Sequence, residues 1–83
     1  MNMTLTYDVS GFNVSEVVEV DIERIGGKYV GRFADWPNIS VLVSKRYIAD
    51  QILPSLIEVL YLQDGERVRV RHMGSRLGAA SKR

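Results

Sequence analysis

The chain has 83 residues, of which 46% are apolar and 25% charged, and its formal net charge is +1. A chain of this length forms one small domain around a single core. It contains no cysteine, which excludes disulfides, thiolate zinc sites, thiol nucleophiles and iron–sulfur clusters. His72 is the only histidine, which argues against the common Ser–His and paired-histidine sites. We therefore expect a protein that is not an enzyme and that holds neither a cofactor nor a metal.

Targeting and membrane signals are missing from the sequence. The start, MNMTLTYDVSGF, has neither the basic cluster nor the unbroken apolar run of a signal peptide. The most apolar stretch, residues 48–62, contains Asp50, Pro54 and Glu58 and is too short and too polar to cross a bilayer. These features predict a soluble, cytoplasmic protein.

In chain order, the first clear element is a strand over residues 18–23. Its letters alternate between apolar and acidic residues, which places Val18, Val20 and Ile22 on a buried face. Gly26-Gly27 then predicts a hairpin turn, because glycine adopts a positive φ without steric cost. A second strand follows over residues 28–36, and a third over residues 39–43 after the turn chemistry of Trp36-Pro37-Asn38.

A helix is predicted over residues 45–63, with Ser44 as its N-cap and Asp64-Gly65 at its end. Pro54 removes one backbone hydrogen bond, so we expect a kink there, or two short helices. The residues expected to lie on the sheet recur at helical spacing and are Ile48, Ile52, Leu56, Val59 and Leu60.

The last predicted strand covers residues 66–73, with Val68 and Val70 facing inward and arginines facing outward. Residues 4–10, TLTYDVS, show a weaker strand pattern. We expect residues 1–74 to form the single domain and residues 75–83 to form a flexible basic tail, because that segment has too few apolar groups to offset the entropy of ordering it.

The element order predicts an α+β fold: an antiparallel β-β-β-α-β sheet covered on one face by one kinked helix. A right-handed crossover would return the last strand parallel to residues 18–23 and beside them, in the order 3-2-1-4. Residues 1–23 carry acids and no base, whereas residues 67–83 carry bases and no acid. The predicted order therefore sets one acidic row beside one basic row, with Glu19, Asp21 and Glu23 facing Arg67, Arg69 and Arg71.

The run from about Val17 to Leu62 resembles the HicB-like antitoxin family. The features that carry the resemblance are the Tyr29-Val30 strand, Phe33 and the Asp35-Trp36-Pro37 turn. After Leu62 we expect only a strand and a tail, without the DNA-binding extension that members of this family usually carry. The resemblance implies a stand-alone module that inhibits or sequesters a partner protein, as antitoxins do to toxins and as anti-CRISPR inhibitors from phages and mobile elements do to host defence complexes.

Two groups of residues are candidates for contacting that partner. The first is apolar: Trp36 in a loop, and a second helical stripe of Leu53, Ile57 and Tyr61. Such a stripe indicates a homodimer or a docked partner, with a single core shared by both stripes as the alternative. The second group is basic and consists of Arg67, Arg69, Arg71 and Arg76.

Nucleic-acid binding and hydrolysis are the alternatives to protein binding. The arginines, with Lys82 and Arg83, could grip the phosphates of a nucleic acid, or they could simply pair with the acidic row. A hydrolase using Asp35 or His72 is the other alternative. It is disfavoured because no Ser, Cys or acid lies at a spacing that would orient His72, and Asp35 is better explained as a turn residue.

Overall fold

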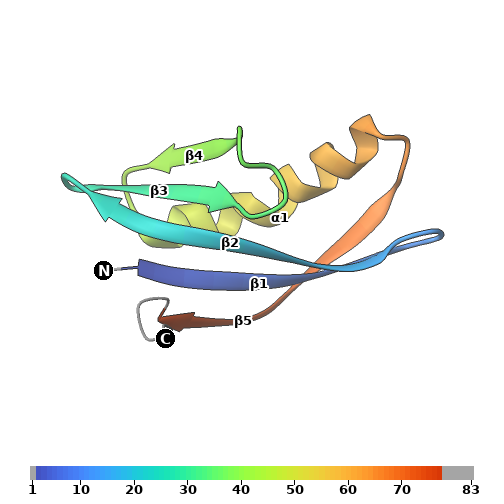
Figure 1. Ribbon diagram of the computed structural model, residues 1–83, viewed down its shortest axis with the longest axis horizontal. Coiled ribbons are helices and arrows are strands. Elements are labelled where there is room, and N and C mark those ends of the chain that lie inside the picture. The colour runs from blue at the N-terminus through green and yellow to red at the C-terminus, as the bar shows by residue number, and fades with distance from the viewer. Residues whose placement is uncertain (1, 78–83) are drawn as a thin grey trace.

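The computed structural model describes residues 2–77 of the chain (Figure 1). Its elements follow one another as β1 (Asn2–Gly11), β2 (Ser15–Ile25), β3 (Lys28–Phe33), β4 (Ser40–Val43), α1 (Arg46–Gln63) and β5 (Val68–Leu77). The strands form one sheet in the order β4-β3-β2-β1-β5, and every neighbouring pair is antiparallel. The predicted α+β class is confirmed, with one helix packed against the sheet before the last strand.

The position of β1 corrects the predicted strand order. The weak pattern of residues 4–10 belongs to a full strand, and β1 lies between β2 and β5 (Figure 1). β5 still runs in the same direction as β2, because each is antiparallel to β1. The two strands are not neighbours, so the predicted order 3-2-1-4 is wrong.

The hairpin between β2 and β3 forms as predicted. Gly26 and Gly27 both have a positive φ, of 57° and 87°, which is the backbone that a tight two-residue turn requires. The alternation is confirmed as well, since Val18, Val20 and Ile22 are buried on the face that meets the helix.

The helix spans the predicted residues but begins differently. Its N-cap is Lys45, which makes no side-chain capping bond, so the prediction of Ser44 is wrong. The helix continues as one element through Pro54, which rules out the two-helix alternative. At its end, Gly65 takes a φ of 84°, and the backbone N–H groups of Gly65 and Glu66 donate to the carbonyls of Leu62 and Tyr61.

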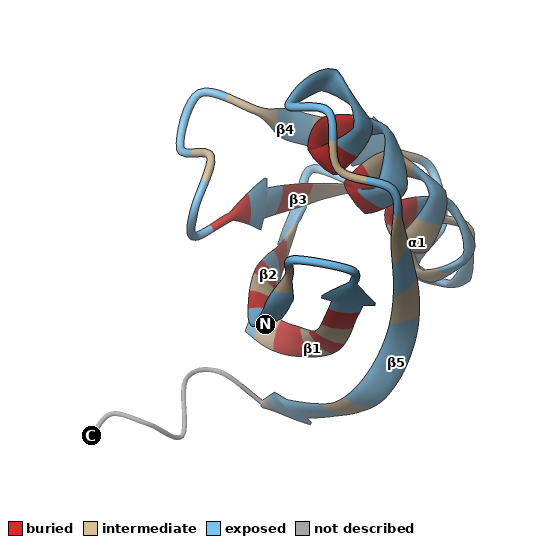
Figure 2. Ribbon diagram, turned by 90° about the vertical axis from the view of Figure 1, so that its right-hand side faces the viewer, coloured by how far each residue is buried: buried red, intermediate tan, exposed pale blue. Residues whose placement is uncertain are grey.

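The core lies between α1 and the concave face of the sheet, where Figure 2 colours the buried parts of β1, β2, β3 and α1 red. β1 contributes three consecutive inward residues, Leu5, Tyr7 and Val9. The helix contributes Ala49, Leu53, Ile57, Leu60 and Tyr61. Within the described residues, no helix is long and apolar enough to span a membrane.

β5 is longer than predicted and contains an irregularity. It runs to Leu77, three residues beyond the expected end of the domain at Gly74, and it pairs there with the start of β1. Residues 78–83, the rest of the predicted tail, lie outside the described residues. The pairing passes from Tyr7–His72 to Thr6–Gly74, so Met73 is an extra residue, a β-bulge.

Candidate functional site

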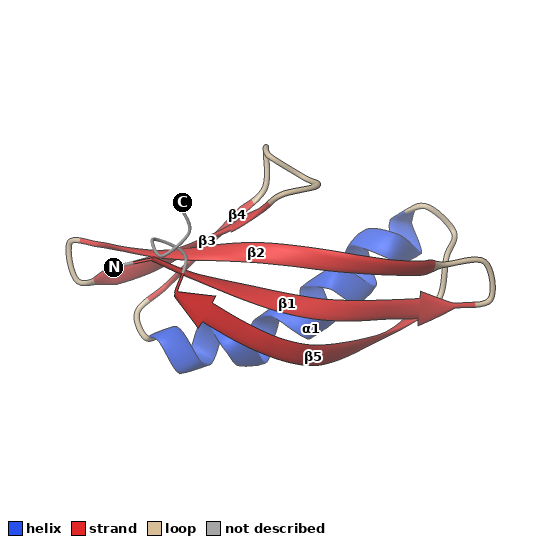
Figure 3. Ribbon diagram, turned by 60° about the horizontal axis from the view of Figure 1, so that its bottom comes forward, coloured by secondary structure: helices blue, strands red, loops and turns tan. Residues whose placement is uncertain are grey.

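The most exposed part of the sheet is its open face together with the β5 edge. α1 covers only one face, and β5 forms one border of the sheet with no strand beyond it in the described residues (Figure 3). On β5, half-buried Val70 lies opposite the inward Val9 of β1, and half-buried Val68 lies opposite Gly11. The intervening arginines point to the open face, as the sequence alternation predicted.

The bulge decides which arginines share that face. Arg71 lies opposite Asp8 and Arg76 lies opposite Thr4, and both β1 residues point away from the helix. Arg76 is five positions after Arg71, an odd number, so an unbroken strand would place the two arginines on opposite faces. The extra residue at Met73 shifts the alternation of side chains by one position, so that Arg76 points to the same face as Arg71. Arg69, Arg71 and Arg76 therefore form one row on the open face.

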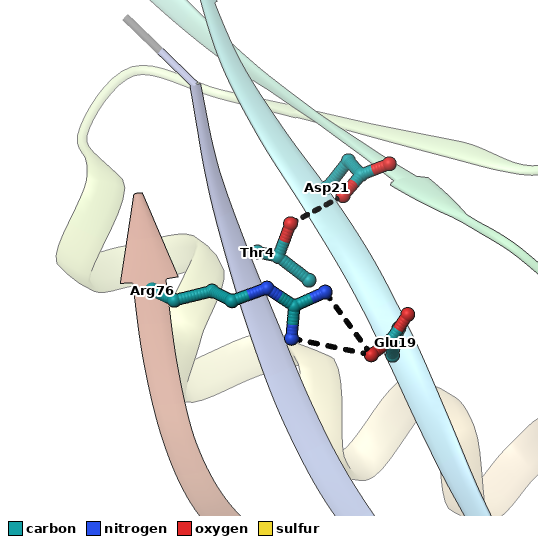
Figure 4. A network of polar contacts seen from close by, with 4 residues as sticks. All are labelled: Thr4, Glu19, Asp21 and Arg76. Carbon is teal, nitrogen blue, oxygen red and sulfur yellow. Dashed lines mark hydrogen bonds and ion pairs between the residues drawn. The ribbon is translucent and has the colours of Figure 1, made fainter. Parts of the chain in front are cut away.

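Figure 4 shows how this row connects to the acidic strand. Arg76 reaches over β1 to Glu19 on β2, with both guanidinium nitrogens 3.4 Å from one carboxylate oxygen. Next to this pair, the Thr4 hydroxyl donates to Asp21 at 2.7 Å. Arg71 is 3.8 Å from Asp8, and its side chain remains 76% exposed. These polar contacts therefore involve residues of β1, a strand that is not part of the predicted order 3-2-1-4.

The predicted pairing of the two charged rows is therefore wrong in detail. β1 separates Arg67, Arg69 and Arg71 from Glu19, Asp21 and Glu23. Glu23 instead pairs with Arg32 of β3 at 3.0 Å. Among the described residues, Arg67 and Arg69 have no carboxylate within 4 Å. Arg67, which directly precedes β5, and Arg69, the first arginine of the row, are consequently less neutralised than Arg71 and Arg76.

A shallow hollow marks this start of β5. It is lined by Ser10, Gly11, Arg67, Val68 and Arg69. Gly11 allows the chain to approach closely, because a Cβ there would lie 2.7 Å from the backbone oxygen of Arg67. The next residue, Phe12, sits in the β1–β2 turn and is 98% exposed. Sequence reasoning overlooked Phe12, although an aromatic residue beside a turn glycine was visible.

The predicted apolar stripe is not available to a partner. Leu53, Ile57 and Tyr61 are buried in the core, so their assignment as contact residues is wrong. Four of the five residues expected to lie on the sheet are instead only half-buried or exposed, with Ile52 and Val59 exposed, and only Leu60 is buried. The buried line along the helix is Ala49, Leu53, Ile57 and Tyr61, with Leu60 beside its end.

Trp36 is held in the molecule rather than presented as a free anchor. Its ring packs edge-on against Phe33, with centroids 5.9 Å apart, and against Tyr61 at 5.6 Å. One edge lines a hollow with Glu16, Val17, Asp35, Tyr61 and Asp64. The indole thus joins the loop after β3 to the end of the helix.

Two phenols fasten the helix to the sheet. Tyr7 donates a hydrogen bond to Asp50 at 2.7 Å, and Tyr61 donates one to Glu16. Burial is the main cause that raises the pKa of Tyr7, and the bond to Asp50 raises it further. Burial and Glu16 raise the pKa of Tyr61 in the same way. Both phenols are therefore neutral donors at physiological pH.

The two residues considered for hydrolysis do not meet. Asp35 lines the hollow beside Trp36, whereas His72 lies on β5 with its ring 5.1 Å from that of Tyr7. Across residues 2–77, no group of three His, Asp or Glu side chains is placed to hold a metal ion. A separate hollow at the start of α1 is lined by basic and aromatic side chains, among them Arg24, Tyr29, Lys45, Arg46 and Tyr47.

Comparisons with protein-family models, with curated proteins and with solved structures find no match to this chain. The resemblance to HicB-like antitoxins therefore stays a prediction, and the surfaces described above are the basis for any statement about function.

Proposed function

We propose that this protein is a small non-enzymatic binding module that inhibits or sequesters a partner protein, and that the partner covers the β5 edge. The observation that carries the proposal is the state of β5. It is a ten-residue border strand whose outer side pairs with no other described strand, and its open-face side chains are exposed arginines. A strand edge with unpaired N–H and C=O groups is a template for pairing with another chain.

The other predicted contact residues support this choice by elimination. Leu53, Ile57 and Tyr61 belong to the core, and Trp36 is packed between two aromatic rings. Of the predicted partner-binding residues, only the arginines are exposed. An antitoxin-like or anti-CRISPR-type inhibitor of the kind that the sequence resemblance implies would act through such a surface.

Nucleic-acid binding is the second candidate, and the same exposed arginines favour it. Phosphate contacts on the open face would however meet Asp8 and Glu19, which already lie beside Arg71 and Arg76. The acidic strand β2 lies beside β1, on the side of β1 away from β5. A partner that approaches β5 from its outer edge avoids these carboxylates, and for that reason we favour a protein.

A photo-crosslinking experiment tests the proposal. The photoreactive residue p-benzoylphenylalanine replaces Arg69 in one variant and exposed Leu42 of β4 in a matched control, and both are irradiated in the cells that encode the protein. We expect an adduct with a defined protein from position 69 and none from position 42. Equal labelling from both positions, or no adduct, would contradict the proposal, and an adduct removed by nuclease would favour nucleic-acid binding.

A further inference from the structure

The β5 edge also indicates what kind of segment it can accept, an inference that rests on the proposed function. We propose that the partner supplies an acidic extended segment, which adds to the sheet beside residues 67–72 with carboxylates at alternate positions facing Arg69 and Arg71, and with an apolar residue against Phe12.

The charges of this stretch support an acidic occupant. Arg67 and Arg69 have no ion pair within the described residues, and the contact of Arg71 with Asp8 is long, at 3.8 Å. Arg69 and Arg71 lie two residues apart on one strand, a spacing of about 6.8 Å. Carboxylates on alternate residues of an added strand recur at the same spacing, so both arginines can be paired at once.

The same charges disfavour a second copy of this chain at the β5 edge. Two β5 strands pairing edge to edge would bring the arginine row of one chain beside that of the other. Like charges on adjacent strands are destabilising. The row thus selects a partner of opposite charge and works against self-association through this strand.

The bulge and the turn define the ends of the docking stretch. Met73 interrupts the regular ladder after His72, so a partner strand can follow β5 in regular register only up to that point. At the other end, Phe12 is 98% exposed in the turn directly after Gly11, and Gly11 lines the hollow with Arg67 and Val68. An exposed aromatic ring is a typical anchor at protein interfaces.

Fluorescence anisotropy with designed peptides tests this inference on the full chain. The probe is a labelled eight-residue peptide that alternates glutamate and valine. The comparison peptides are a block peptide with four glutamates followed by four valines, and an alternating lysine–valine peptide. We expect the alternating acidic peptide to bind at least several-fold more tightly than the block peptide, and the lysine peptide not to bind.

Two double variants then locate the site. Arg69→Glu/Arg71→Glu and Lys28→Glu/Arg32→Glu change the net charge equally, but only the first pair lies on β5. We expect the first to weaken binding about tenfold or more and the second to change it less than about twofold. Arg69→Gln/Arg71→Gln serves as a milder version should charge reversal unfold the chain. Phe12→Ser should weaken binding, whereas Leu42→Ser at the other edge should not.

The outcomes separate this inference from the proposed function. Equal binding of the alternating and block peptides, equal effects of the two double variants, or no binding of the acidic peptide would overturn the inference of an acidic strand. If the photo-crosslink at position 69 nevertheless captures a protein, the β5 edge remains the binding surface and only the chemistry of the segment is wrong. If that crosslink fails too, the proposed function falls.

Discussion

The two edges of the sheet are built in opposite ways. β4 has four residues, none of them charged, and its Leu42 is 65% exposed. β5 has ten residues, carries three arginines and is interrupted by the bulge at Met73. Both edges lack a further strand in the described part of the chain, yet each limits unwanted pairing by a different means (Figure 3).

This difference shows that protection against aggregation and selectivity for a partner can be separate properties. Short length protects β4 against every strand, because few hydrogen bonds can form. Charge protects β5 only against neutral or cationic strands, since an acidic strand would be attracted instead. A long edge strand that carries charges of one sign can therefore still pair with a partner strand of the opposite charge.

The largest expected effect on the free energy of unfolding comes from replacing a glycine close to a sheet edge, Gly11 near β5 or Gly31 near β4. Gly11→Ala places a Cβ 2.7 Å from the backbone oxygen of Arg67, which cannot move without displacing the start of β5. We expect a loss of about 1–3 kcal/mol in the free energy of unfolding. Gly31→Ala, near β4, would come within 3.2 Å of the end of the Ile22 side chain and into ordinary contact with Val20 and Val41, but it meets no backbone atom, so it should cost less.

Urea denaturation monitored by circular dichroism measures these differences. Gly74→Ala is the matched control on β5, because a Cβ there has no heavy atom within 4 Å. Its free energy of unfolding should stay within about 0.5 kcal/mol of the parent protein. A Gly11→Ala protein as stable as Gly74→Ala would show that the start of β5 is loosely attached.

The β2–β3–β4 half of the sheet was predictable from local pattern, whereas the β5 half was not. Val18, Val20 and Ile22 alternate strictly, and the Gly-Gly turn fixes the register of the following strand. β1 carries the same kind of signal in Leu5, Tyr7 and Val9, but Thr4 and Thr6 on its other face are less polar than acids, so the contrast is weaker there than on β2. Its place between β2 and β5 depends on distant pairing, which local periodicity does not encode.

The candidate site was predicted in part for the same reason. The exposure of the β5 arginines follows from alternation alone, but the inclusion of Arg76 in the row depends on the bulge at Met73. The helix is apolar over much of its circumference, so its inward face was decided by tertiary contacts. Tyr7 bonding to Asp50 and Tyr61 bonding to Glu16 set that rotation, and both partners lie more than forty residues away in sequence.

The next effect in size concerns the attachment of the helix to the β5 side of the sheet. Tyr7→Phe removes the hydrogen bond to Asp50 and leaves that half-buried carboxylate without its phenol partner. We expect a loss of about 1–2 kcal/mol in the free energy of unfolding. Tyr29→Phe on β3, beside β4, is the matched control and should cost little, and equal losses would contradict a special role for the Tyr7 bond.

The pH dependence of stability gives an independent check on Tyr7. Its pKa is raised above the ordinary value near 10, so the folded protein holds the phenolic proton more tightly than the unfolded chain does. The stability contributed by this proton is complete below about pH 10 and is lost as the pH rises further. Tyr61 is raised in the same direction. Urea titrations between pH 8 and 11 should therefore show a shallower alkaline decline in Tyr7→Phe than in the parent protein.

The smallest effects are expected from the ion pairs on the open face. Double-mutant cycles with alanine compare Arg32–Glu23, at 3.0 Å between adjacent strands, with Arg76–Glu19, at 3.4 Å across the intervening strand β1. All four side chains are between 41% and 58% exposed, so each coupling energy should lie between about 0.2 and 1 kcal/mol and decrease with salt. We expect the coupling energy of the Arg76–Glu19 pair to be the smaller one. The Arg76 side chain must extend across β1, which costs more conformational entropy, and its contact with Glu19 is longer. A stronger coupling for Arg76 than for Arg32 would mean that the row on β5 is held to the acidic strand, and Arg76 would then be less free to meet a partner than Arg69.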